Sequence, residues 1–292
     1  MKTAIRLFFL LVVLTILGCE EDVVFFDDTP PLPPTNISTL TGDGVVQIFW
    51  DMNTEADLAG YNVYWSEDNN KFNLLGSTTT NSYVDNNASN GVRTYYAVTA
   101  YDVNGNESEL STDLSYATPR SEGYNYMIHD YLNFPGLSGF SFAKAASNES
   151  SVVAFDDLSC DFFYENNGTD FYINVWESFQ IKDMGLTNNI HDIWEAPVGG
   201  WNSELFVIDG YNEKVKSALA FVGHTYVIKT VDNHYAKIRV TEITPQTISF
   251  DWAYQNAEGV MDLEKRTDKS ASINREKGKR KKDINGSVKI IR

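Results

Sequence analysis

The chain has 292 residues, a net charge of −17 and 13% aromatic residues. The charge is uneven: 11 basic and 3 acidic residues lie at or after Lys265, whereas residues 19–264 hold 10 basic and 37 acidic residues, a charge of −27. So acidic a surface repels phosphate backbones, which argues against a nucleic-acid partner. Abundant Tyr, Phe and Trp beside Val, Ile and Thr favour strands, so we expect a mainly β protein.

The first 22 residues have the features of an export segment. Lys2 and Arg6 precede an apolar run that is too short to span a bilayer of about 30 Å as a permanent helix. The run ends in Ile16-Leu17-Gly18-Cys19, which resembles the signal of bacterial lipoproteins. The resemblance implies a signal peptide over 1–18 and a lipid on Cys19, with an ordinary secretory signal as the alternative.

A lipid on Cys19 implies a protein of the outer membrane that is held there by its anchor. Residues 19–31 are predicted to be an acidic and proline-rich linker. Its run Glu20-Glu21-Asp22 resembles the surface-export signal of lipoproteins in the Bacteroidetes, and a solvated spacer is the alternative. The first reading implies exposure at the cell surface.

Residues 32–119 read as short strands separated by turn residues. Val46, Ile48 and Trp50 occupy alternate positions, as residues that line one face of a strand do. The segments Gly60 to Trp65 and Tyr95 to Asp102 complete a pattern that resembles a fibronectin type III domain. The resemblance implies a seven-stranded β-sandwich with Trp50 in its core and Tyr96 at the tyrosine-corner position.

The chain beyond residue 119 is predicted to hold an inter-domain segment over 120–135, a second β-rich domain over 136–262 and a basic, disordered tail over 263–292. Residues 181–212 read as a loop-rich insert, and residues 214–220 as one or two helical turns. A hairpin is predicted over 225–241 with its turn at Asp232-Asn233. Together with Ile248 to Gln255, it resembles the end of the HmuY-like domain of Bacteroidetes surface lipoproteins. Some members of that family capture haem.

The usual catalytic signals are missing from the sequence, which has no Gly-x-Ser-x-Gly, no His-Glu-x-x-His and no phosphate-binding loop. Cys160 reads as a small core residue, and Asp102, Asn104 and Asn106 read as a turn rather than a calcium loop. We therefore expect neither an enzyme nor a metal site. The predicted function is a non-catalytic binding or display lipoprotein whose partner is a surface protein, a glycan or a small ligand.

Two alternatives specify the ligand. A haem-capturing protein would need two axial ligands, and His224 and His234 would stand about 20 Å apart on a straight hairpin, so His191 would have to pair with one of them. Met184 is a further candidate axial ligand. We expect no cofactor, with haem as the alternative. A carbohydrate-binding accessory protein would stack sugar rings on Trp176, Trp194 and Trp201, although a core position is the favoured reading of all three.

Overall fold

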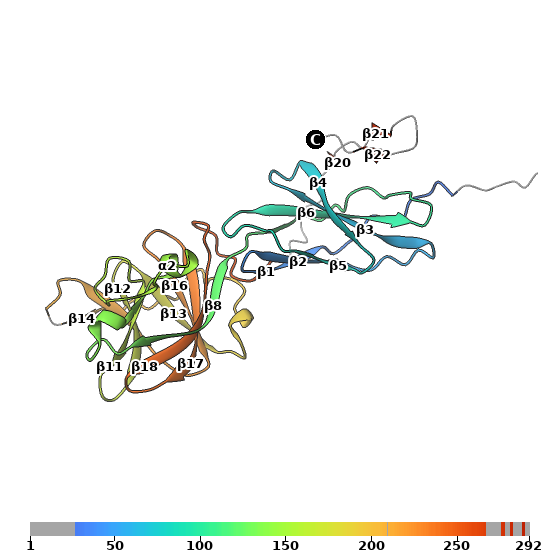
Figure 1. Cartoon of the computed structure of the whole chain (residues 1–292). Helices are drawn as coiled ribbons and strands as arrows, with labels where there is room; N and C mark the ends of the chain where they lie inside the picture. The colour runs from blue at the N-terminus through green and yellow to red at the C-terminus, as the bar shows by residue number, and fades with distance from the viewer. Residues whose placement is uncertain (1–26, 209, 267–275, 278–280, 283–287, 290–292) are drawn as a thin grey trace, which may run out of the picture.

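The computed structural model describes residues 27–208 and 210–266, together with short strands at 276–277, 281–282 and 288–289. The predicted signal peptide, Cys19 and most of the predicted tail lie outside the described residues. The protein is mainly β and consists of a β-sandwich followed by a second β-rich body, as the sequence predicts. Figure 1 shows the two bodies end to end, with the N-terminal one at the right.

Among the described residues, there is no helix with the length and apolar character that a membrane span requires.

The N-terminal body is a sandwich of two sheets. One sheet is antiparallel and has the order β1-β2-β5, with β19 beside β1; the other has the antiparallel order β4-β3-β6-β7, with β20 beside β4 in the parallel direction. This is the fibronectin type III sandwich. The strands are β1 (Ser38–Gly42), β2 (Val45–Phe49), β3 (Leu58–Ser66), β4 (Lys71–Thr78), β5 (Ser82–Asp85), β6 (Thr94–Asp102), β7 (Ser115–Ala117), β19 (Lys265–Arg266) and β20 (Glu276–Lys277).

The core of this sandwich forms as the alternating pattern predicts. Trp50 is 3% exposed, and its ring meets that of Tyr61 edge-to-face at 5.2 Å. Tyr96 is fully buried and donates from its hydroxyl to the carboxylate of Asp85, at the end of β5, over 2.9 Å. Both residues therefore lie between the sheets.

The C-terminal body also has two sheets. A six-stranded sheet has the order β10-β9-β11-β12-β15-β14, and a five-stranded sheet has the order β13-β16-β17-β18-β8. The strands are β8 (Ser121–His129), β9 (Gly139–Phe140), β10 (Val152–Val153), β11 (Phe162–Asn166), β12 (Phe171–Trp176), β13 (Gln180–Leu186), β14 (Phe206–Val207), β15 (Lys214–Leu219), β16 (His224–Lys229), β17 (Tyr235–Ile243) and β18 (Thr247–Tyr254). Short helices are η1 (Pro135–Leu137), α2 (Phe142–Ala146) and η2 (Ile190–Asp192).

Alternate residues of both sheets face one apolar core. Phe140 and Phe162 come from the six-stranded sheet, and Tyr226, Ile238 and Phe250 from the five-stranded sheet. The predicted hairpin is confirmed, because Lys229 pairs with Tyr235 across the turn. The opposite face of the five-stranded sheet carries Val227, Tyr235 and Lys237, and it is on this outer face that the candidate site lies.

Three predictions for this body are wrong. The predicted inter-domain segment over 120–135 instead contributes β8, an edge strand that pairs with β18, and its Ile128 is buried in the core. The predicted helical turns over 214–220 are strand β15, which pairs with β12 and β14 and buries Val215 on one face of the sheet and Ala218 on the other. The loop-rich insert begins with strand β13, whose Ile181 is buried.

The chain passes between the two bodies twice. It enters the C-terminal body at Arg120 and returns at Leu263 and Glu264, after which β19 pairs with β1 of the first sandwich. Leu263 and Glu264 are 0% and 3% exposed. The predicted tail over 263–292 therefore begins too early, and its first two residues are packed instead at the junction of the bodies.

Candidate functional site

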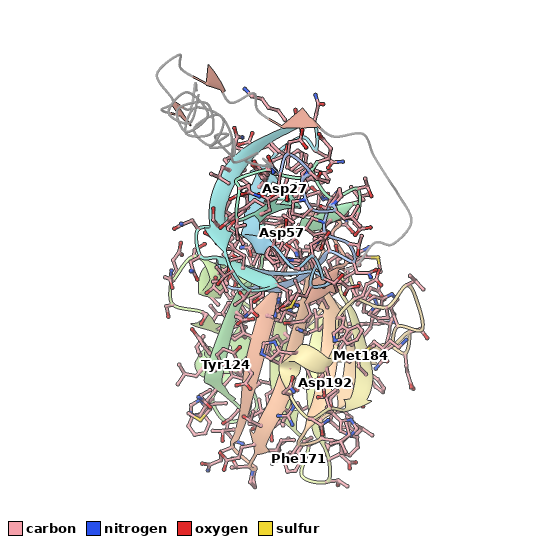
Figure 2. The ribbon with its side chains drawn as sticks, turned by 90° about the vertical axis from the view of Figure 1, so that its right-hand side faces the viewer. Asp27, Asp57, Tyr124, Phe171, Met184 and Asp192 are labelled. Atoms are coloured by element: carbon pink, nitrogen blue, oxygen red, sulfur yellow. The ribbon has the colours of Figure 1, made fainter. Side chains whose placement is uncertain are left out.

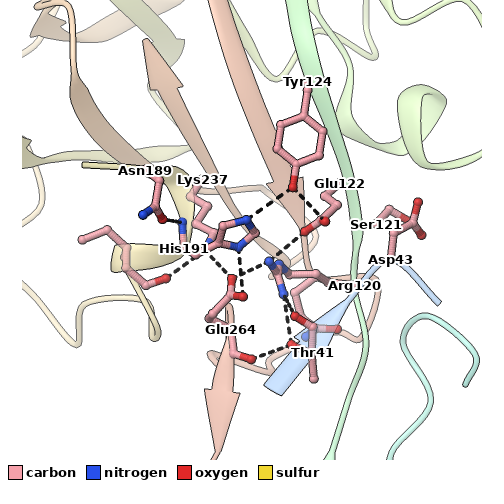
Figure 3. Close-up of polar contacts among 12 residues, drawn as sticks. Thr41, Asp43, Arg120, Ser121, Glu122, Tyr124, Asn189, His191, Lys237 and Glu264 are labelled. Carbon is pink, nitrogen blue, oxygen red and sulfur yellow. Dashed lines mark hydrogen bonds and ion pairs between the residues drawn. The ribbon is translucent and has the colours of Figure 1, made fainter. Parts of the chain in front are cut away.

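A cleft of about 530 Å³ lies where the two bodies meet, and we call it the junction cleft. The first sandwich contributes residues of β1 and β2, and the C-terminal body contributes residues of β8 and of the loop around η2. The lining residues are Leu40, Thr41, Gly42, Val45, Gln47, Glu122, Tyr124, Asn189, His191, Trp194 and Glu264. Figure 3 shows the polar contacts at its floor.

Arg120 and Glu264 meet at the floor of the cleft. The Arg120 side chain has no exposed surface, and its guanidinium donates to the carboxylates of Glu122 at 2.8 Å and Glu264 at 2.5 Å. It also donates to the backbone oxygen of Thr41 at 2.8 Å. Because residues 41, 120 and 264 come from three separate stretches of chain, this guanidinium ties the two bodies together.

Lys237 is the second buried cation. It points from the outer face of β17, and its ammonium donates to Glu264 at 3.1 Å and to the backbone oxygen of Ile193 at 2.9 Å. Burial, assisted by the nearby positive charge of Arg120, lowers the pKa of Lys237 to about 7, against the attraction of Glu264. Two carboxylates thus balance Arg120 and a partly protonated Lys237.

His191 connects this floor to the rim. It lies in η2, where Asn189 and Asp192 form a capping box and the Asn189 side chain accepts from the backbone N–H of His191. Nδ1 of His191 is 3.0 Å from Oε1 of Glu264. An ionised carboxylate only accepts, so Nδ1 donates to Glu264, while Nε2 on the other side of the ring faces the Tyr124 hydroxyl.

The rim carries two exposed aromatic rings. Tyr124 is 47% exposed, and its hydroxyl donates to Glu122 over 3.0 Å and lies 3.4 Å from Nε2 of His191. Trp194 is 57% exposed, yet the backbone oxygen of Trp194 accepts from Leu263 at 2.7 Å and that of Ile193 accepts from Lys237. The Tyr124 ring is thus held through its hydroxyl and the backbone at Trp194 by hydrogen bonds to Leu263 and Lys237, while both rings remain open to solvent.

The structure separates the residues of the haem alternative. His224 and His234 lie on the core side of the hairpin, where they contact the rings of Tyr226 and Tyr254 and form ion pairs with Asp183 and Asp232. His191 and Met184 lie on the outer face; Met184 packs with Val227 and Tyr235. Figure 2 shows Met184 and Asp192 on the same side of the ribbon. The backbone of the sheet therefore stands between His191 and either hairpin histidine.

The three candidate tryptophans differ in exposure. Trp176 packs with Phe155, Phe163 and Tyr211, and Trp201 packs partly buried near Leu263. Trp194 alone of these three is largely exposed and lines the cleft.

One acidic cluster lies elsewhere, in the first sandwich. Carboxylate oxygens of Asp27, Asp57 and Asp102 come within 4.8 Å of one another (Figure 2 labels the first two). The Asp102 carboxylate accepts from the backbone of Asn104 and Asn106 and from the Asn106 side chain. These bonds are those of a turn, which is what the sequence predicts for residues 102–106.

Sequence reasoning found His191 and Trp194 but missed Arg120, Glu122, Tyr124, Lys237 and Glu264. The sequence held one sign of the buried Lys237. It lies in the run Tyr235-Ala236-Lys237-Ile238, a strand in which the neighbouring side chains are all buried. A cation there needs an anion from elsewhere in the chain.

A comparison with models of known protein families finds no match to the chain. Among curated proteins, it is similar to an amylopullulanase of Thermoanaerobacter thermohydrosulfuricus, with 35% identity over 253 residues that cover 84% of this chain and 13% of that protein. An amylopullulanase of Thermoanaerobacterium saccharolyticum is 36% identical over 89 residues, which cover 30% of this chain and 7% of that protein. The chain thus spans less than a seventh of the length of either relative.

Among solved structures, the chain is similar to a DUF4466 family protein from Parabacteroides merdae, with 11% identity and a TM-score of 0.36, covering 77% of this chain and 99% of that one. An Fn3-like protein from Clostridium thermocellum has 22% identity and a TM-score of 0.27, covering 32% of this chain and all of that one. The assignment of the N-terminal fold rests on the strand order given above.

Proposed function

We propose that the protein is a lipid-anchored, non-catalytic binding protein of the cell surface and that the junction cleft is its ligand site. The observation that carries the cleft assignment is the pair of exposed rings, Tyr124 and Trp194, beside a buried ionic floor to which the Tyr124 hydroxyl and the backbone of residue 193 are bonded. Rigid aromatic groups beside a concave surface are typical of binding sites. In this reading the first sandwich is both a spacer and one wall of the site.

The ionic floor supports binding rather than catalysis. Glu264 already accepts hydrogen bonds from Arg120, Lys237 and His191, so its lone pairs are engaged within the protein. A general base needs a free lone pair directed at its substrate. The sequence matches also fall on a small part of each amylopullulanase, which supports a module that accompanies other domains rather than a whole enzyme.

Cell-surface anchoring rests on the sequence alone. Ile16-Leu17-Gly18-Cys19 supports lipidation, and a diacylglycerol with a further acyl chain gives stable membrane attachment where one chain gives only marginal binding. Glu20-Glu21-Asp22 supports export to the outer surface.

A ligand screen that is unbiased by chemical class tests the cleft assignment. Soluble protein from Glu20 to Arg292 would be screened by ligand-observed NMR against mixed neutral, cationic and anionic compounds, short peptides and oligosaccharides. We expect binders whose signals are lost with Trp194→Ala and kept with Phe206→Ala. Phe206 is a matched control, because it is 44% exposed on β14, at the far end of the C-terminal body from the cleft (Figure 1). A screen with no binder sensitive to Trp194→Ala would refute the assignment.

A further inference from the structure

We propose that the junction cleft binds a neutral oligosaccharide, an inference that rests on the proposed function of the cleft as a ligand site. Three features of the cleft carry it: the two exposed rings, the mixed donors and acceptors beside them, and the internal compensation of its charges.

The rings supply the surface that a sugar ring needs. One face of a pyranose presents C–H groups, which pack against the electron-rich face of an aromatic ring. Trp194 and Tyr124 are 57% and 47% exposed, and both line the cleft. Their positions are set by the backbone contacts of residues 193 and 194 and by the Tyr124 hydroxyl bond to Glu122. Little ordering of the protein is therefore needed when a sugar binds.

The polar lining suits hydroxyl groups, each of which donates one hydrogen bond and accepts others. Gln47 from β2 and Asn189 from the η2 loop are exposed amides, which both donate and accept. Glu122, with a side chain that is 14% exposed, is an acceptor next to Tyr124. These groups stand at opposite walls of the cleft, one wall from each body, so a ligand of several sugar units can contact both.

Charge favours a neutral ligand over an ionic one. Arg120 and Lys237 are fully buried beneath Glu122 and Glu264 and are already paired with them, so neither cation is free to bind a phosphate, sulfate or carboxylate. The surrounding chain is strongly acidic, since residues 19–264 carry −27. That field repels anionic polymers. A cationic ligand stacked over the two rings is the competing possibility, and the experiment below separates it from a neutral sugar.

The experiment uses hexasaccharides of defined charge. Maltohexaose, cellohexaose, xylohexaose and mannohexaose are the neutral probes, hexagalacturonate is the anionic probe, and the glucosamine hexamer is the cationic probe. Each would be titrated into the chain from Glu20 to Arg292 by calorimetry. We expect saturable binding of at least one neutral probe and weaker or no binding of both charged probes.

Variants then place the binding in the cleft. Trp194→Ala and Tyr124→Ala should each weaken the neutral probe by about tenfold, which corresponds to the loss of one stacking contact. Trp194→Phe should retain part of the affinity, and Phe206→Ala should leave it unchanged. Thermal unfolding of each variant confirms that the fold is kept.

Two outcomes would overturn the inference. Either no neutral hexasaccharide binds, or one binds with the same affinity to Trp194→Ala and Tyr124→Ala as to the unaltered chain. If the class-unbiased screen still finds cationic or peptide ligands that need Trp194, the proposed function survives and the sugar assignment alone fails. If that screen is negative as well, both fail.

Discussion

Lys237 is a buried lysine whose partners come from distant parts of the chain. Its side chain has no exposed surface, and burial lowers its pKa from 10.5 to about 7. In the unfolded chain the same amine titrates near its ordinary value. Between those two pH values the unfolded state binds a proton that the folded state lacks, so stability must depend on pH there.

We predict that the unfolding free energy rises as the pH increases from 7 to about 10.5, by up to about 1.4 kcal/mol per pH unit from Lys237. Well below pH 7 the Lys237 amine is protonated in both the folded and the unfolded state. Its contribution to the unfolding free energy is then constant and at its least favourable value. Lys237→Met removes the titrating group, so the stability of the unaltered chain should rise relative to that of the variant as the pH rises. Urea unfolding at pH 7, 8 and 9 measures this difference. Parallel pH profiles would contradict the prediction.

Asp161 shows the opposite dependence. Its carboxylate accepts from the backbone N–H of Phe142, the first residue of α2, over 2.6 Å. Burial raises its pKa to about 7, against the lowering effect of that hydrogen bond. The folded state therefore holds a proton between pH 4 and 7 that the unfolded state releases, and stability falls as the pH rises through this interval.

We predict that Asp161→Asn is more stable than the unaltered chain at pH 8 and that this advantage shrinks as the pH falls from 7 to 4. Asparagine keeps an acceptor for Phe142 and carries no charge. Chemical denaturation at pH 4.5, 6 and 8 gives the comparison, with Asp156→Asn, an exposed neighbour, as the control. If Asp161→Asn were less stable than the unaltered chain by the same amount at every pH, the prediction would be wrong, because the ionised Asp161 carboxylate would then stabilise the fold.

At the level of elements, alternation predicted the strands that have one clearly buried face. The segment Thr247–Tyr254 is β18 with the same bounds, and the 225–241 hairpin differs from β16 and β17 only at its ends. The edge strand β8 was missed. In β8, Tyr124 and Met127 are exposed and Asn125 has a φ of 60°, which interrupts the alternation.

The site was harder to predict than the strands, because its partners are far apart in sequence. Arg120 and Glu264 are 144 residues apart, and neither has a local pattern that indicates a partner. His191 was predicted as an axial ligand, and it lies instead between Glu264 and Tyr124. The residue type alone indicated that position 191 is part of a polar site. Its contacts with Glu264 and Tyr124 arise only when the two bodies pack together, which the sequence does not reveal.

β8 gives a prediction at this scale. A fragment over 136–264 lacks the edge strand, leaves β18 unpaired on one side and exposes the core around Ile128. We expect it to unfold without a cooperative transition, whereas a fragment over 120–264 should unfold cooperatively. Circular dichroism during thermal unfolding distinguishes the two. A cooperative transition of equal midpoint in both fragments would show that β8 is dispensable.

At the level of the whole molecule, the described chain begins at the end of the first sandwich that is opposite the cleft. The described chain begins at residue 27, whose backbone oxygen accepts from Asn106 in the β6–β7 loop, while Gly42 and Arg120 meet at the junction. An anchor on Cys19 would therefore hold the cleft away from the membrane, with the sandwich between them.

We predict that Cys19→Ala moves the protein from the membrane fraction to the soluble fraction, because its acyl chains are lost. Replacement of Glu20, Glu21 and Asp22 by alanine should keep the membrane association and reduce digestion by protease added to intact cells. Fractionation and protease shaving measure the two effects. A Cys19→Ala protein that still sediments with membranes would exclude lipid anchoring at this residue.

The two chain crossings at the junction have a mechanical consequence. Two bodies joined by a single linker can swivel, but here the backbone crosses at Arg120 and again after Glu264, and β19 then pairs with β1. Twisting one body against the other would have to break the β1–β19 ladder and pull Arg120 out of its buried ion pairs. A large polymer that is dragged by flow past the cell exerts torque on its holder. We expect this junction to transmit such a torque rigidly to the predicted anchor, so that the two walls of the cleft keep their positions relative to each other.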